Sequence, residues 1–325
     1  MPQPNLHSRS TVIDGLIVSK WSRKLFEAMQ AGGLTAANCT CSVWEGFEDS
    51  MRAVGQWKQW LRENDDLIRQ VYTADDIEQA KAEGRVGIIL GWQNSDGFGE
   101  DIRTVALYAE LGLRVVQLTY HNANSVGAGC LETIDRGLTD FGHELVAALN
   151  DAGILMDLSH VGSQTSADAV RVSKKPLAYT HCAPKALKDH PRNKSDEDLR
   201  MVADSGGMVG VTMFPPFMPR GSESTLEDYL EVIEYVINLC GEEQVGIGTD
   251  FTQDVPPEAM AYFLHYKGYG RSLLQPKGVV FPEEFKRIEQ YPNLTNAMER
   301  RGWSEDRISR ILGANWTRLF REVWI

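Results

Sequence analysis

Short runs of apolar and β-branched residues alternate with longer amphipathic segments along most of the chain. Eight such runs lie at residues 11–18, 33–44, 86–92, 114–122, 153–160, 176–181, 207–213 and 244–250. Several of the segments between them begin with Ser, Thr or Asp and end on Gly, which is typical of helix starts and stops. Parallel strands that helices cover on both faces read as continuous apolar runs. The alternation therefore predicts repeated strand and helix units around a parallel sheet.

Two architectures can be built from such units, a closed (β/α)8 barrel and an open doubly wound sheet. Eight strands favour the barrel, and no Gly-x-Gly-x-x-Gly fingerprint follows the first strand to favour a dinucleotide-binding sheet. A barrel needs about 250 residues, so the 325 residues fit one domain with additions. We predict a single α/β domain, a (β/α)8 TIM barrel over residues 1–325. The segment 45–75 is expected to be a helical insertion, and the tail from about residue 256 to hold extra C-terminal helices.

The composition indicates in which compartment the protein works and which classes of partner it does not bind. The net charge is −12 and no basic cluster is present, which argues against a protein that binds the phosphate backbone of nucleic acids. No signal peptide is visible at the start, and no apolar run approaches the roughly 18 residues that span a bilayer. An odd number of cysteines without a paired framework suits a reducing compartment; they are Cys39, Cys41, Cys130, Cys182 and Cys240. We expect a cytoplasmic protein with free thiols that binds neither nucleic acid nor membranes.

Polar side chains with catalytic potential stand at the ends of four predicted strands. These residues are His121, His160, His181 and Asp250. Catalytic groups of a barrel come from the carboxyl ends of different strands, so we expect these four to meet at one mouth. Imidazole and carboxylate groups in one cavity are the ligands of a hydrolytic zinc site, which needs about three protein ligands and an open position for water. The alternative is that each group bonds to nearby backbone at the edge of the core.

Arg192 lies in the loop that follows the sixth predicted strand. Its planar guanidinium is suited to clamp a substrate carboxylate through two hydrogen bonds. A surface ion pair is the simpler alternative. The remaining histidines are His7, His143, His190 and His265, and we expect these to be structural or solvated.

Four runs of sequence carry a family signature. They read LTYHNAN, GILMDLSHVGSQTSADAV, PLAYTHCAPKALKDHPRNKSDEDLRMVADSGGMVGVTMFPPF and VGIGTDF, and they cover much of the chain in the family's order. The chain therefore resembles the membrane (renal-type) dipeptidase family of metal-dependent, amidohydrolase-like barrels. The resemblance implies two zinc ions, bridged by a glutamate, that activate a water to attack the peptide bond of a dipeptide. It also implies a homodimer.

The resemblance extends to single residues. His160 and His181 resemble the two imidazole ligands of one metal. Asp250 resembles the carboxylate that binds the other metal and handles the proton. His121 resembles the group that polarises the substrate carbonyl or stabilises the tetrahedral intermediate, and Arg192 resembles a substrate-binding arginine.

Three ligand positions depart from the family pattern. The family's first strand reads Asp-Gly-His-x-Asp, whereas Leu16 and Val18 stand here in place of the His and the second Asp. Gln93 stands where the bridging glutamate is expected. Asp250 alone cannot hold the first ion, because a bound divalent metal needs several protein ligands. We therefore expect at most one zinc or other divalent ion, at the two histidines, or none.

Three functions fit this sequence. The first is a dipeptidase-like hydrolase of a dipeptide or small amide, working with an incomplete metal site. The second is a metal-free proton-transfer or lyase enzyme using His121 and Asp250, since a barrel supports many chemistries and burial without a cation raises the pKa of a carboxyl group. The third is a non-catalytic binder of small molecules. Metal analysis separates the first from the others, and activity that survives a strong chelator points to the second.

Overall fold

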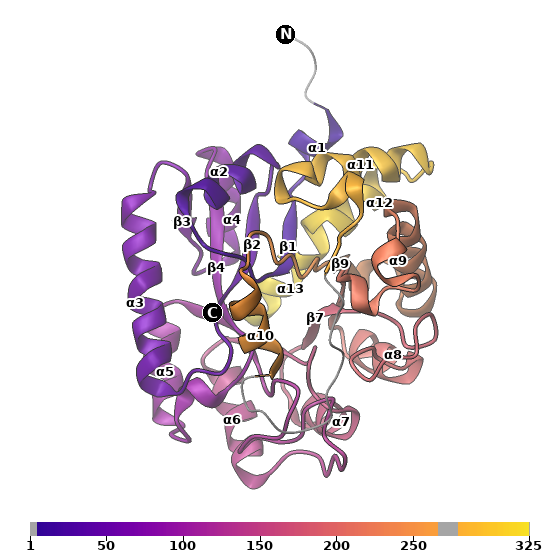
Figure 1. Ribbon diagram of the computed structural model, residues 1–325. Helices are drawn as coiled ribbons and strands as arrows, with labels where there is room; N and C mark the ends of the chain where they lie inside the picture. Colours follow the sequence, from indigo (N-terminus) through magenta and orange to yellow (C-terminus); the bar gives the residue numbers. More distant parts are fainter. Residues whose placement is uncertain (1–4, 266–278, 325) are drawn as a thin grey trace.

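Eight parallel strands form a nearly closed barrel with helices around it (Figure 1). The computed structural model describes residues 5–265 and 279–324. The barrel strands are hydrogen-bonded in the order β1-β2-β4-β5-β6-β7-β8-β9. Their bounds are Ile13–Ile17 (β1), Ala36–Ser42 (β2), Val86–Trp92 (β4), Leu113–Gln117 (β5), Leu155–Asp157 (β6), Ala178–Cys182 (β7), Met208–Val211 (β8) and Val245–Ile247 (β9). Each overlaps a predicted run, and only β5 and β7 extend beyond theirs, by one residue each, so the predicted TIM barrel is confirmed.

The first and last strands close the cylinder. Ile17 forms a parallel bridge with Phe251, and the backbone N–H of Val18 donates to the Phe251 carbonyl at 3.0 Å. The helices that connect and cover the strands in Figure 1 are α2 (Arg23–Ala31), α3 (Phe47–Glu63), α4 (Ala74–Ala82), α5 (Arg103–Glu110), α6 (Asp140–Asp151), α7 (Ser163–Val172), α8 (Asp196–Asp204) and α9 (Leu226–Cys240). After β9 follow α10 (Pro257–His265), α11 (Tyr291–Arg300), α12 (Glu305–Ser309) and α13 (Asn315–Val323).

The segment 45–75 contains a strand that the sequence pattern did not predict. After α3 the chain forms β3 (Ile68–Gln70), which pairs in parallel with β4 outside the barrel. Its three residues are too few for a strand period to be recognised in the sequence. The segment therefore combines a 17-residue helix with a short strand.

The amino-terminal end of the barrel is closed by a tryptophan. Trp316 of α13 is fully buried and packs in the barrel interior. A Cβ atom at Gly15, Gly210 or Gly246 would lie 2.6, 2.9 or 2.5 Å from its indole. These glycines therefore make room for the ring. With this end filled, a site can open only at the carboxyl ends of the strands.

The first described residues form the short helix α1 (Leu6–Arg9), which is anchored by a histidine. His7 is 6% exposed. Its Nδ1 lies 2.7 Å from Thr295 Oγ1 and its Nε2 lies 2.9 Å from the Gly32 carbonyl. This histidine is structural, and it ties α1 to α2 and α11. All five cysteines are free, as expected.

No helix within residues 5–265 and 279–324 combines the length and the apolar composition needed to cross a bilayer.

Candidate active site

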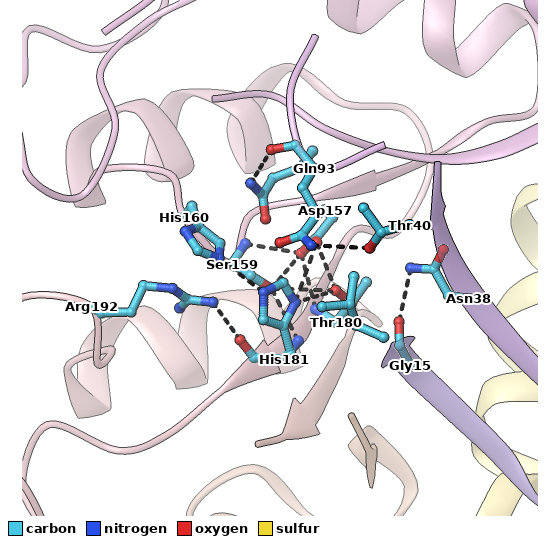
Figure 2. Close-up of polar contacts among 12 residues, drawn as sticks. Gly15, Asn38, Thr40, Gln93, Asp157, Ser159, His160, Thr180, His181 and Arg192 are labelled. Atoms are coloured by element: carbon cyan, nitrogen blue, oxygen red, sulfur yellow. Dashed lines mark hydrogen bonds and ion pairs between the residues drawn. The ribbon is translucent and has the colours of Figure 1, made fainter. Parts of the chain in front are cut away.

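Three histidines from neighbouring strand ends form a continuous chain of ring contacts. His160 Nε2 lies 2.9 Å from His181 Nε2, and His160 Nδ1 lies 3.1 Å from His121 Nδ1. The first pair is visible in Figure 2. His181 belongs to β7, while His121 and His160 lie just beyond β5 and β6. All three are at most 5% exposed. The structure therefore brings together three of the four strand-end residues selected from the sequence.

Asp250 follows β9 and is a buried carboxyl group of 8% exposure. Its pKa is raised to about 7, mainly by burial; the charge of Arg192 opposes this rise, and the charges of Asp14 and Asp157 add to it. The charge of Arg192 also lowers the pKa values of His160 and His181, after the larger effect of their burial. Arg192 thus acts on the imidazole chain and on Asp250 at once.

Arg192 is a fully buried cation rather than a partner in a surface ion pair. Its Nη2 donates to the His181 carbonyl at 2.7 Å (Figure 2), and its guanidinium carbon lies 5.4 Å from the centre of the Phe217 ring. Within the described residues, its Nε and Nη1 have no hydrogen-bond partner. Unpaired buried donors are costly and are rare in native proteins, so these nitrogens are suited to receive a ligand.

Two of the site residues have strained backbones. The φ angles of His121 and Asp250 are 61° and 60°, in the left-handed region that non-glycine residues seldom adopt. Such strain costs on the order of 1–3 kcal/mol and gathers at functional sites. At both positions it re-aims the side chain just after a barrel strand ends.

Asp157 and Thr180 orient the His181 ring from its Nδ1 side, and the sequence did not predict either residue as part of the site. The Thr180 hydroxyl donates to the Asp157 carboxylate at 2.6 Å and lies 2.8 Å from His181 Nδ1 (Figure 2). Because the hydroxyl proton points to the carboxylate, the hydroxyl oxygen accepts from the Nδ1–H of His181. His181 Nε2 is then unprotonated and faces His160. Asp157 also accepts from the Ser159 hydroxyl and N–H at 2.5 and 2.9 Å, and this Asp-x-Ser turn was the available sequence signal.

The position of the first metal in the family pattern is apolar in this structure. Leu16 and Val18 are 2% and 7% exposed. Asp14, in the same strand, is already bonded to its surroundings: it accepts from the Thr249 and Tyr291 hydroxyls at 2.5 and 2.6 Å. Burial raises the pKa of Asp14 to about 6 despite these bonds.

Gln93, at the bridging position, uses its side-chain amide locally and donates to Thr40 Oγ1 at 3.0 Å (Figure 2). In the part of the chain that the structure describes, no three His, Cys, Asp or Glu side chains form a group that could hold a metal ion. These side chains do not fit a two-metal centre. The two converging Nε2 atoms of His160 and His181 are the nearest approach to one metal site.

The chain is similar to known proteins over nearly its whole length. A family model described as membrane dipeptidase (peptidase family M19) matches residues 22–324. A crystal structure of an amidohydrolase from Pseudomonas aeruginosa is 48% identical, with a TM-score of 0.96 and 98% of each chain covered.

More distant relatives agree with these matches. An uncharacterised dipeptidase from Schizosaccharomyces pombe is 30% identical over 269 residues, which is 80% of this chain and 58% of that protein. The chain therefore matches little more than half of that relative. A metallo peptidase from Rhodobacter sphaeroides, liganded with a phosphinate mimic of the dipeptide L-Ala-D-Ala, is 21% identical with a TM-score of 0.81. The alignment covers 97% of this chain and 99% of that chain, and the similarity shows that the two proteins share a fold.

Proposed function

Because the chain belongs to the membrane dipeptidase family, peptidase family M19, we propose that it hydrolyses dipeptides or small amides that resemble them. One observation carries the proposal: the imidazole chain lies at the carboxyl ends of the strands, and the buried Arg192, which has two unpaired donors, acts on both His181 and the buried Asp250. A buried cation beside a poised acid is suited to hold an anionic substrate end and to move a proton.

Arg192 and His121 bind the substrate. The free donors of Arg192 form charge-assisted hydrogen bonds to the carboxylate of the substrate, and burial excludes competing water. His121 polarises the carbonyl of the scissile amide. Its strained backbone keeps the imidazole next to His160, 3.1 Å away between Nδ1 atoms.

Asp250 transfers the proton, as general base and then as general acid. A general base works best when its pKa lies near the working pH, and burial brings the pKa of Asp250 to about 7. Asp250 takes a proton from the water that attacks the amide carbon. It then gives this proton to the departing amine nitrogen as the C–N bond breaks.

The metal content that we propose is at most one divalent ion, zinc or another, held by the Nε2 atoms of His160 and His181. The unprotonated Nε2 of His181, fixed by Thr180 and Asp157, is the state that a metal ligand requires. When bound, such an ion supplies Lewis-acid chemistry. Substrate binding and proton transfer use only the side chains of this chain. A homodimer remains a prediction from the family resemblance.

A second candidate function is metal-free proton transfer or lyase chemistry by His121 and Asp250. It is favoured by the apolar Leu16 and Val18, which leave Asp250 without the cation that the family pattern supplies.

A combined assay tests both candidates. Wild type, His181→Ala and the control His143→Ala are screened against dipeptides and small amides while their metal content is measured. His143 is an exposed imidazole on α6, so its loss should change neither quantity. We expect wild type to hydrolyse at least one substrate and His181→Ala to lose turnover together with any bound metal. Absence of hydrolysis by wild type would refute the hydrolase, and full hydrolysis in a strong chelator would show that turnover needs no metal ion.

A further inference from the structure

Tyr120 lies against the imidazole chain and takes no part in the proposed substrate binding by Arg192 and His121 or in proton transfer by Asp250. Its ring stacks on the His160 ring, with centroids 4.2 Å apart and planes 19° apart. It also lies 4.2 Å from the His121 ring and makes a T-shaped contact with Trp44 at 5.0 Å. The residue is 6% exposed. Three aromatic neighbours therefore fix the direction of the Tyr120 hydroxyl.

The backbone of His121 explains why two consecutive side chains face the same site. In an extended strand, neighbouring side chains point to opposite faces. The left-handed φ of 61° at His121 breaks this alternation and places the His121 ring beside Tyr120. The strained turn thus brings the Tyr120 hydroxyl and the His121 imidazole, two hydrogen-bond donors from adjacent positions, to the same part of the site.

The hydroxyl of Tyr120 is a hydrogen-bond donor on a residue that is only 6% exposed. A tyrosine hydroxyl usually finds a partner when it is buried. Burial raises the pKa of Tyr120, the charge of Asp250 raises it further, and the charge of Arg192 acts in the opposite direction. The phenol therefore remains a donor, and it lies within the field of both the proposed base and the proposed carboxylate clamp.

We propose that Tyr120 is a further catalytic residue whose hydroxyl donates a hydrogen bond to the oxygen of the scissile carbonyl, alongside His121. This inference rests on the proposed hydrolase function. As the water oxygen bonds to the carbonyl carbon, the C=O π electrons move onto the carbonyl oxygen. The hydroxyl of Tyr120 stabilises that negative charge, and the charge returns to re-form the carbonyl when the C–N bond breaks. Donors aimed at such an oxygen act mainly on the transition state.

The test is Tyr120→Phe, which removes one oxygen atom and keeps the stacked ring. The substrate is the dipeptide or amide that wild type hydrolyses fastest, and the probe is the phosphinate mimic of that substrate, whose tetrahedral centre resembles the intermediate. We expect kcat to fall by about 10²–10³-fold with a smaller change in KM. Binding of the phosphinate, measured by calorimetry, should weaken more than binding of the substrate.

Tyr108→Phe is the matched control. Tyr108 is also buried, but it lies in α5 and its hydroxyl donates to the Phe47 carbonyl, so the loss of that hydroxyl should leave kcat unchanged. Equal melting temperatures for wild type and Tyr120→Phe would show that the fold is intact. If wild type hydrolyses its substrate and Tyr120→Phe matches it in kcat and phosphinate binding, the role of Tyr120 is overturned while the hydrolase stands. If wild type hydrolyses nothing, both proposals fall.

Discussion

The burial of the Asp250 carboxyl group lowers the stability of the folded protein at pH values where this group is ionised. Its pKa in the folded protein is raised to about 7, mainly by burial, whereas an aspartate in an unfolded chain ionises near 3.9. The folded state therefore favours the protonated form. The stability that this preference contributes is complete below about pH 4 and is lost as the pH rises through 7.

Replacing Asp250 by asparagine should consequently stabilise the protein in a pH-dependent way. We expect Asp250→Asn to raise the free energy of unfolding by about 2–4 kcal/mol at pH 8, because one pKa unit corresponds to roughly 1.4 kcal/mol. The gain should vanish near pH 4, where both versions are neutral. Urea unfolding at the two pH values measures the difference, with the exposed Asp65→Asn as control. An equal gain at both pH values would contradict the raised pKa.

At the scale of elements, the helix α10 is joined to the site through aromatic side chains. The Trp44 indole donates to the backbone carbonyls of Tyr262 and Phe263 at 3.1 and 3.2 Å. The Tyr262 hydroxyl donates to the Glu45 carboxylate at 2.7 Å. Trp44 in turn contacts Tyr120. The segment between β2 and α3, with Trp44 and Glu45, therefore connects α10 to the wall of the site.

The fit between α13 and the barrel gives a second prediction. A Cβ at Gly246 would lie 2.5 Å from the Trp316 indole nitrogen, so Gly246→Ala should destabilise the protein by about 1–3 kcal/mol through overpacking. Trp316→Phe in the same chain should recover part of the loss, because the smaller ring leaves room. The two effects should be non-additive in a double-mutant cycle measured by urea unfolding.

Gly55→Ala is the control for that cycle. Gly55 lies within α3, and an added Cβ would meet no atom within 4 Å. Alanine there should stabilise the protein by up to about 1 kcal/mol, because glycine is a poor helix former. Independent, additive effects of Gly246→Ala and Trp316→Phe would contradict the tight contact.

On the scale of the whole molecule, the barrel core is complete around a site that lacks three of the family's metal ligands, at Leu16, Val18 and Gln93. Buried apolar side chains fill the interior layer and the layer between barrel and helices. We therefore expect the fold to be independent of metal, in contrast to small domains that a zinc ion holds together.

Restoring the family ligands should raise the number of bound ions. We expect the triple variant Leu16→His, Val18→Asp and Gln93→Glu to bind more zinc per chain than wild type, up to two ions, since it supplies the missing first-metal and bridging groups. Elemental analysis after dialysis measures the stoichiometry, and circular dichroism checks the fold. Gln93→Glu alone, which leaves Leu16 and Val18 in place, is the matched control. Two ions per chain in wild type would contradict the incomplete centre.

The sequence by itself determined the architecture and the main candidate residues of this protein. Apolar periodicity and helix-capping residues report local burial and local backbone conformation, so all eight barrel strands could be predicted from them. The same barrel topology placed His121, His160 and His181 close together, because parallel strands end at one mouth. The apolar Leu16 and Val18 were likewise evident from the sequence alone.

Only the tertiary structure decided which groups act on these residues. The carboxylate of Asp157 supports His181 across 24 positions, His7 meets Thr295 across 288, and Trp316 fits against glycines of three strands. The full burial of Arg192 and the stacking of Tyr120 on His160 likewise depend on loops from different strands. No local pattern encodes these contacts, because barrel closure brings together residues that are distant in the chain, and packing then sets their distances, their burial and their pKa values.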